Sequence, residues 1–225
     1  MTPAEFDLFY ARCHEDGALQ ECVSTIAAVL GSTPAAFDWL WRAAKLEHFQ
    51  AMQAQEAGEL PAAKAHFSSG AALARRAQEL SPIQVEGVFW RGVCDLEAAR
   101  LSGKLAAART LGPAEKQVDR AARLDEAYHY AGPLRVLGRI AHLKPFLIGG
   151  SLDAALAYYN RALQIAPENS TTLLYCAEAL IHDRQPAAAR KRLHQILEGP
   201  ALPDWVWETE RDRKFAQEWL KTRFD

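Results

Sequence analysis

The sequence lacks any long uninterrupted apolar segment. A helix that crosses a bilayer needs about 20 consecutive apolar residues. The most apolar stretch, RVLGRIAHLKPFLI at 135–148, is broken by two arginines, a histidine, a lysine and a proline. The N-terminal segment also lacks the basic start and apolar centre of a signal peptide, and carries Glu5 and Asp7 instead. The sequence as given therefore predicts a cytoplasmic chain with no membrane span.

Positive charge is not in excess either. There are 26 Lys and Arg residues against 28 Asp and Glu residues, which gives a formal net charge of -2. A protein that binds nucleic acid needs clustered cations to contact phosphates. Here the two signs alternate instead, as in WETERDRKF at 207–215. We therefore predict no nucleic-acid partner.

Cysteine is scarce and scattered. The chain has four cysteines, and no two of them have the C-x-x-C spacing of a zinc ribbon. So few and such widely spaced cysteines also argue against a dense disulfide framework. We therefore predict small buried thiols on helices at Cys13, Cys22, Cys94 and Cys176.

Enzyme signatures are absent as well. The sequence contains no H-E-x-x-H, G-x-S-x-G, G-x-x-x-x-G-K-[ST] or G-x-G-x-x-G pattern. We therefore predict a non-enzymatic protein without catalytic residues, metal ligands or a cofactor.

One short glycine-rich stretch leaves a phosphate site open as an interpretation. Gly149, Gly150 and Ser151 precede an amphipathic segment, and helix N-terminal amides on a flexible backbone suit an anion. The same residues also suit a turn, in which glycine accepts a positive φ and the serine hydroxyl caps the next helix. The repeat pattern described below favours the turn, so a nucleotide-dependent enzyme is the least favoured class.

The chain does contain a series of amphipathic segments separated by short breaks of Pro, Gly, Ser or Asp. No segment shows sustained period-two alternation rich in Val, Ile and Thr, so the fold class is predicted to be all-α. In GSTPAAFDW, the hydroxyls of Ser32 and Thr33 are expected to cap a helix that begins at Pro34. The expected helices cover residues 3–14, 17–30, 34–57, 60–80, 84–103, 106–124, 133–143, 151–166, 169–183, 186–198 and 203–222.

The helices recur in pairs with a tetratricopeptide-like pattern. The small, aromatic, small and proline positions of the second helix of a repeat are occupied by Ala155, Tyr159, Ala162 and Pro167. The first helix, whose small residues let the two helices approach closely, is matched by Leu134, Leu137, Gly138 and Ala141. A second unit follows directly and is marked by Leu173, Ala177, Leu180, Ala189 and Leu193.

The turn inside the first of these repeats is longer than usual. Gly138 and Ala155 are 155 - 138 = 17 positions apart, whereas the common repeat has about 12 positions there. About five residues, PFLIGG or nearly so, are therefore inserted between the paired helices. An apolar insertion in a loop is costly to expose, so we expect it to cover a groove or to contact another subunit.

Helix pairs of this kind bury little surface alone and must stack. We therefore predict a single domain over 1–225, with a helix pair at 1–33, repeats at 34–198 and a C-terminal capping helix at 199–225. The aromatic residues of that last segment are expected to cover the end of the stack or to lie at an oligomer interface. They are Trp205, Trp207, Phe215 and Trp219.

Two stretches resemble a particular family. YHYAGPLRVLGRIAHLKP, followed by GGSLDAALAYYNRALQIAPENSTTLLYCAEALI, is similar to the TatT family. This is the tetratricopeptide-like T component associated with some bacterial tripartite ATP-independent periplasmic (TRAP) transporters. FDWLWRAAK and FWRGV are compatible with earlier helices of that family, and the resemblance is sharpest from Tyr128 to Leu197.

The resemblance implies a stacked helical fold that encloses a groove or tunnel. It also implies a homo-oligomer that works beside a periplasmic solute-binding protein. Relatives of this kind are lipoproteins, but Cys13 follows FYAR and does not look like a lipidation site. A periplasmic location is the alternative to a cytoplasmic one, if the native signal precedes this sequence.

Aromatic residues and arginines are expected to line the inner side of the stack, together with the apolar insertion. Such a surface suits an apolar ligand that bears a carboxylate, or an extended peptide. Packing in the core is the alternative for each of these rings. The candidate binding residues are Trp39, Trp41, Trp90, Arg91, Tyr128, Tyr130, Arg135, Arg139, Phe146 and Leu147.

The sequence thus favours a binding or scaffold protein over an enzyme. The specific hypothesis is a TatT-like accessory that holds a small hydrophobic acid or docks a solute-binding protein. The alternative is a cytoplasmic tetratricopeptide-repeat scaffold that binds a peptide or another protein.

The apolar insertion gives a first prediction. Replacing Phe146 and Leu147 with Ser should weaken either ligand retention or subunit assembly, because both roles depend on apolar contact. Native mass spectrometry of the purified variant measures both properties at once. Unchanged ligand content together with an unchanged oligomeric state would remove the support for either role.

Overall fold

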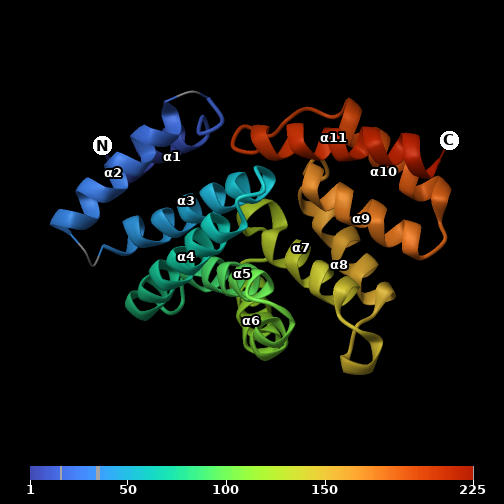
Figure 1. Ribbon diagram of the computed structural model, residues 1–225, viewed down its shortest axis with the longest axis horizontal. Helices are drawn as coiled ribbons and strands as arrows, with labels where there is room; N and C mark the ends of the chain where they lie inside the picture. The colour runs from blue at the N-terminus through green and yellow to red at the C-terminus, as the bar shows by residue number, and fades with distance from the viewer. Residues whose placement is uncertain (16, 34–35, 225) are drawn as a thin grey trace. The chain divides into compact units, whose positions relative to one another are not determined.

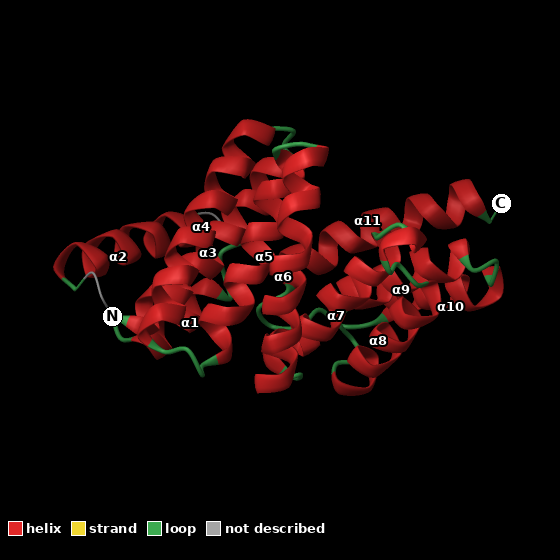
Figure 2. Cartoon of the chain, turned by 90° about the horizontal axis from the view of Figure 1, so that it is seen from below, coloured by secondary structure: helices red, strands yellow, loops and turns green. Residues whose placement is uncertain are grey.

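The computed structural model describes residues 1–15, 17–33 and 36–224. These residues form eleven α-helices and one short 3-10 helix, without a strand (Figure 2). The predicted all-α class is therefore confirmed, and neighbouring helices pack as stacked pairs. Over the same ranges, no helix is both long enough and apolar enough to cross a membrane.

The chain divides into two compact units, Met1–Asp125 and Glu126–Asp225. The helices of the first unit are α1 (Pro3–Tyr10), α2 (Ala18–Ser32), α3 (Phe37–Glu56), α4 (Leu60–Leu80), α5 (Val85–Leu101) and α6 (Lys104–Leu124) (Figure 1). Those of the second are α7 (Tyr128–Leu143), η1 (Phe146–Ile148), α8 (Leu152–Ile165), α9 (Ser170–His182), α10 (Pro186–Glu198) and α11 (Val206–Arg223). A single domain over the whole chain stays a prediction.

All eleven expected helices are present, and the largest differences are at two helix ends. α1 ends at Tyr10 rather than at residue 14, since the chain turns there and Arg12 pairs with Glu15 across the turn at 2.6 Å. α7 begins at Tyr128 rather than at residue 133. Its first turn has left-handed backbone angles at three residues, so the regular helix starts close to the predicted position.

The expected cap of α3 is wrong. Ser32 is the last residue of α2, where its hydroxyl donates to the carbonyls of Ala28 and Val29, and Thr33 is the C-cap of the same helix. The N-cap of α3 is Ala36, which has no side-chain hydrogen bond to offer. The predicted first residue of this helix, Pro34, lies outside the described residues.

In the first unit, α3 to α6 pack one upon the next (Figure 1). Small residues allow the close approach: a Cβ atom on Gly70 of α4 would lie 2.9 Å from the Cys94 Sγ of α5. α1 is joined to α3 by a two-pronged ion pair, in which Arg42 Nε and Nη2 contact the Asp7 carboxylate at 2.8 and 2.7 Å. Planar paired contacts of this kind fix orientation as well as distance.

In the second unit, α7 and α8 form the repeat that the sequence predicts. The ring of Tyr159 on α8 is fully buried and lies over Gly138 on α7, where an added Cβ atom would be 2.5 Å from Cε1. Ala155 and Ala162, on the same helix, are also fully buried. The small and aromatic positions of the pattern therefore have the packing roles that were predicted from their spacing.

The glycine-rich insertion between these helices is a turn, as expected. Gly149 has a φ of 93°. At Gly150 an added Cβ atom would lie 1.7 Å from the Lys144 carbonyl oxygen, which no side chain permits. Ser151 is the N-cap of α8 and accepts a hydrogen bond from the Ala154 amide at 3.2 Å. The turn therefore explains both glycines and the serine without a bound anion.

α11 covers the end of the second unit. It packs against α9 and α10, and its Ala216 is fully buried in the same apolar cluster as Leu193. Trp219 is half-buried against this cluster, and Trp205 is buried beside the start of the helix. The predicted capping role of the last helix is therefore confirmed within this unit.

The contact between α7 and α8 gives a second prediction. Gly138→Ala places a methyl group against the Tyr159 ring, so we expect the free energy of unfolding to fall by about 1–3 kcal/mol, as for other overpacked cores. Urea denaturation followed by circular dichroism measures this change. Gly31→Ala is the matched control, because a Cβ atom there meets nothing within 4 Å on α2. The control should gain up to about 1 kcal/mol from helix propensity. Equal behaviour of the two variants would contradict the packing described here.

Candidate functional site

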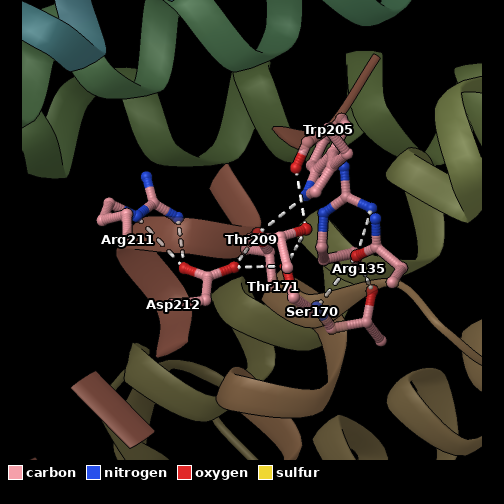
Figure 3. Close-up of polar contacts among 9 residues, drawn as sticks. Arg135, Ser170, Thr171, Trp205, Thr209, Arg211 and Asp212 are labelled. Carbon is pink, nitrogen blue, oxygen red and sulfur yellow. Dashed lines mark hydrogen bonds and ion pairs between the residues drawn. The ribbon is translucent and has the colours of Figure 1, made fainter. Parts of the chain in front are cut away.

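A buried polar cluster lies in the second unit where α7, the start of α9 and α11 meet (Figure 3). Buried polar side chains are unusual in a helical repeat, because each must find a hydrogen-bond partner inside the protein. We call this group the polar cluster; its members are Tyr130, Arg135, Asn169, Ser170, Thr171, Trp205, Thr209, Arg211 and Asp212.

Asp212 holds one half of the cluster together. Its side chain is fully buried, and its Oδ2 atom accepts hydrogen bonds from the hydroxyls of Ser170 at 2.8 Å and Thr171 at 2.6 Å. Its Oδ1 atom accepts from Arg211 Nη2 at 2.7 Å (Figure 3). The carboxylate therefore has a countercharge and also lies at the N-terminal end of α9, where negative charge is favoured.

Trp205 connects this half of the cluster to Arg135. Its indole Nε1 donates to the Thr171 hydroxyl at 3.2 Å, and its carbonyl accepts from the Thr209 hydroxyl at 2.7 Å. The ring is 4.9 Å from the Arg135 guanidinium carbon and meets the Tyr130 ring edge-on, with the ring centres 5.7 Å apart. The Nε1 bond restrains the indole ring, whose face the guanidinium contacts.

Arg135 is the unusual member of the cluster. It is 5% exposed, and its Nη1 atom donates to the Tyr130 carbonyl at 3.1 Å and to Asn169 Oδ1 at 3.3 Å. Among the residues with described positions, no carboxylate lies within ion-pair distance of it. Burial lowers the pKa of its guanidinium to about 10, although the charges of Asp212 and Glu208 oppose this effect from further away. A buried cation without a direct partner is energetically unfavourable.

Asn169 has an unpaired donor next to the guanidinium. The residue is fully buried and is the N-cap of α9. Its Oδ1 atom accepts from the Thr172 amide, the Thr172 hydroxyl and Arg135. Its Nδ2 atom is buried and has no hydrogen-bond partner in the described part of the chain. This unpaired N–H group therefore lies on a side chain that contacts the Arg135 guanidinium.

The backbone beside Arg135 is strained. His129, Tyr130 and Ala131 have φ values of 52°, 55° and 56°, and none of them is glycine. The left-handed conformation costs about 1–2 kcal/mol for each such residue. It directs the Tyr130 carbonyl to Arg135, while the Tyr130 hydroxyl donates to Asp204. Strain of this kind is found at ligand sites and switch regions more often than elsewhere.

The candidate residues of the first unit do not form a comparable site. Trp39 and Trp90 are 9% and 1% exposed and pack in the core, where Trp39 meets Phe6 edge-on. The Trp41 ring lies against the Arg42 guanidinium, 4.1 Å from its central carbon. Arg91 donates to Gln78 at 2.9 Å and approaches Asp95. These contacts correspond to the packing alternative for the rings.

The candidates of the second unit are only partly brought together. Tyr130 and Arg135 belong to the polar cluster, and half-buried Tyr128 lies beside it, with its ring 6.0 Å from that of His129. Arg139 is paired with Glu178 and lies over the Tyr175 ring. Phe146 and Leu147 are 87% and 93% exposed, so the chain itself leaves both side chains uncovered.

Several members of the cluster were not predicted. Asn169, Ser170 and Thr171 follow Pro167 in a helix-start pattern, which gave no reason to assign them a binding role. The alternating charges at 207–215 gave no sign that two of the carboxylates are buried, yet Glu208 and Asp212 are 7% and 0% exposed. Their side of α11 faces α9 rather than solvent.

Two other kinds of site were also considered. In the part of the chain that the structure describes, no group of three or more His, Cys, Asp or Glu side chains is arranged to hold a metal ion. A surface pocket of about 300 Å³ in the first unit is lined by residues that include Leu19, Gln53, Glu59 and His66. None of the candidate binding residues lines this pocket.

Comparison with known proteins gives a family match for most of the chain. The model of the TAtT family, described as the TRAP transporter T-component, matches residues 39–203, which is more than half of the chain. Comparison with curated proteins gives no match. The matched segment contains Arg135 and Asn169, whereas Trp205 and Asp212 follow it.

The cluster gives a third prediction, which compares the contributions of Asp212 and Arg135 to the free energy of unfolding. Asp212→Ala leaves Arg211 and two hydroxyls unpaired, so we expect the free energy of unfolding to fall by about 3–5 kcal/mol. Arg135→Met removes a buried charge that has no direct partner, so stability should be unchanged or higher by up to about 3 kcal/mol. Urea denaturation of the two variants provides the comparison. A large loss of stability in Arg135→Met would show that Arg135 is a structural residue.

Proposed function

The chain belongs to the TRAP transporter T-component family, and from that premise we propose that it is a non-enzymatic accessory of a TRAP-type transport system. We propose further that this accessory binds a small hydrophobic acid. The observation that carries the ligand class is the buried guanidinium of Arg135, which has no carboxylate partner among the described residues.

A carboxylate is the group that best completes the site. The guanidinium offers several N–H donors in one plane, and its Nη1 atom is the one that contacts acceptors within the described residues. The Asn169 side chain is joined to that atom through its Oδ1, so its unused Nδ2 lies on an adjoining group. Two carboxylate oxygens suit two such donors, and the hydrogen bonds would be strengthened by the charges.

The surroundings of the guanidinium favour a ligand whose remaining part is apolar. The rings of His129 and Tyr130 lie 4.9 and 5.7 Å from the ring of Trp205 and meet it at steep angles. Aromatic walls with a few fixed polar groups are typical of sites for small molecules. The proposed ligand therefore places its carboxylate at Arg135 and its apolar part against these rings.

Entry of the ligand requires movement, because Arg135 and Trp205 are each 5% exposed. We assign this movement to the left-handed turn at 129–131. Its strained residues gain energy by relaxing, and the same relaxation would release the Tyr130 carbonyl from Arg135. The Arg135 guanidinium would then lose the neutral Tyr130 carbonyl and bind the charged carboxylate of the ligand.

A second function is favoured by the exposed insertion. Phe146, Leu147 and Ile148 are 87%, 93% and 57% exposed and are consecutive in η1. Exposed apolar side chains that lie together mark surfaces at which proteins associate. We propose this turn as the contact for a solute-binding protein or for a second copy of the chain. A scaffold role in the cytoplasm would use the same surface, and the cellular compartment stays a prediction.

The ligand hypothesis gives a fourth prediction. Decanoate should bind to the full chain, and Arg135→Gln should weaken this binding at least about tenfold, since a hydrogen bond to a charged group contributes about 1.5–3 kcal/mol. Isothermal titration calorimetry measures the dissociation constants, and a shift of the thermal midpoint reports binding independently. Decanol, which has no carboxylate, should bind to both proteins with equal affinity.

Arg139→Gln is the matched control for this experiment. Arg139 is on the same helix, but its guanidinium already contacts Glu178, so decanoate affinity should be close to that of the unchanged protein. Equal weakening in both variants would show that general positive charge, and not the site at Arg135, attracts the acid. No binding of decanoate or phenylacetate to the unchanged chain would refute the ligand class itself.

A further inference from the structure

Two of the four cysteines are in contact. Cys13 lies in the turn after α1 and Cys22 lies on α2, and their Sγ atoms are 3.4 Å apart. Neither is in a disulfide bond, and their residues are 4% and 0% exposed. All four cysteines are buried, as predicted, but the spacing of nine positions between these two gave no sign that they would meet.

The geometry is close to that of a disulfide. The S–S bond is about 2.05 Å long, so the two sulfur atoms need to approach by only about 1.3–1.4 Å. Both cysteines belong to the first unit, and α1 and α2 pack against each other there. The two sulfur atoms therefore already lie in contact within a pair of packed helices.

The two thiols also differ chemically from the other cysteines. The Cys13 S–H donates to Cys22 Sγ, which lowers the pKa of Cys22 against the opposing effect of burial. Burial raises the pKa of Cys94 and of Cys176. Since the thiolate is the reactive form, Cys22 is better prepared for exchange than Cys94 or Cys176.

We propose that Cys13 and Cys22 form a redox-active pair that closes into an intramolecular disulfide and fastens the turn after α1 to α2. The oxidant is a low-molecular-weight disulfide. The Cys22 thiolate attacks one of its sulfurs and displaces the first thiolate, which takes up the proton lost by Cys22. Cys13 then gives up its proton and attacks the Cys22 sulfur of the mixed disulfide, which releases the second thiol. The protein loses two electrons and two protons, and the oxidant gains them.

Burial sets the conditions for this reaction. A disulfide reagent cannot reach sulfurs that are 4% and 0% exposed in the folded state. Exchange therefore proceeds through local opening of α1 and α2, which pack against α3 less extensively than α4 does. The disulfide therefore forms slowly. It stabilises the packing of α1 and α2 and does not respond rapidly to an oxidant.

The pair is a feature of this chain beyond its family assignment. The family match begins at residue 39, after both cysteines. The inference depends on neither the proposed ligand nor the proposed transport role, and its test uses neither.

The experiment uses the reduced full chain in a buffer of oxidised and reduced glutathione without denaturant. After an acid quench and alkylation, tryptic peptide 13–42 should be lighter by two hydrogen atoms and should carry no alkyl group. Cleavage after Glu15 or Glu21 should leave its two halves linked. Cys94 and Cys176 are internal controls and should remain reduced. The thermal midpoint of the oxidised protein should be higher than that of the reduced protein.

Cys13→Ser and Cys22→Ser are the matched variants, and each should abolish the difference between oxidised and reduced midpoints. A lower midpoint after oxidation would overturn the proposal, because the disulfide would then be incompatible with the folded helix pair. Stable glutathione adducts on the separate cysteines, or disulfides between two chains, would overturn it as well. Oxidation of Cys94 and Cys176 at the same redox potential would show that the pair has no special reactivity.

Discussion

The polar cluster depends above all on one buried carboxylate. Asp212 accepts from Ser170 and Thr171 at the start of α9 and from Arg211 on its own helix, so it joins α11 to the last repeat through bonds of fixed direction. A network of this kind specifies a single arrangement only when each member is satisfied. Because Thr171 also accepts from the Trp205 indole, the carboxylate indirectly fixes the ring that lies against Arg135. The capping helix thus does more than cover apolar surface: it completes the surroundings of the candidate site.

The two halves of the cluster have opposite electrostatic character. Around Asp212 the charge is compensated within contact distance, and this half resembles a structural core. Around Arg135 the guanidinium contacts a carbonyl, an amide oxygen and an aromatic face, and Asn169 has an N–H without a partner among the described residues. This asymmetry is the reason to place a ligand at Arg135 and not elsewhere in the cluster, since donors without acceptors define the chemistry of the missing group.

Sequence patterns predicted the helices and the packing of α7 on α8, because these depend on local spacing. Two members of the polar cluster, Tyr130 and Arg135, were also among the candidate binding residues. Gly138 and Tyr159 could be recognised because small and aromatic positions recur in tetratricopeptide-like repeats. Asp212 could not be recognised, because alternating charges on a helix are typical of a solvated face and only the packing of α11 on α9 shows which carboxylate is inside. The left-handed turn at 129–131 could not be predicted from the sequence either. Gly132 and Pro133 indicate a break in the helix, but they do not give the sign of φ in the residues before them. The meeting of Cys13 and Cys22 depends on how the chain turns between α1 and α2, and no cysteine motif encodes that turn.

Two unfavourable features lie side by side in this protein, and their proximity argues for a common cause. A buried guanidinium that has no carboxylate within ion-pair distance among the described residues lowers stability, and so do three consecutive left-handed residues. Each has a simple apolar or right-handed replacement. The Tyr130 carbonyl links them, because the strained turn presents it to Arg135 as a substitute acceptor. A carboxylate ligand would displace this weaker partner in a region of low dielectric constant, where a charged contact is strongest. On the proposed function, the ligand-free form is therefore the strained state. The free energy of binding then has two sources, which are the new ion pair with Arg135 and the relaxation of the left-handed backbone at 129–131.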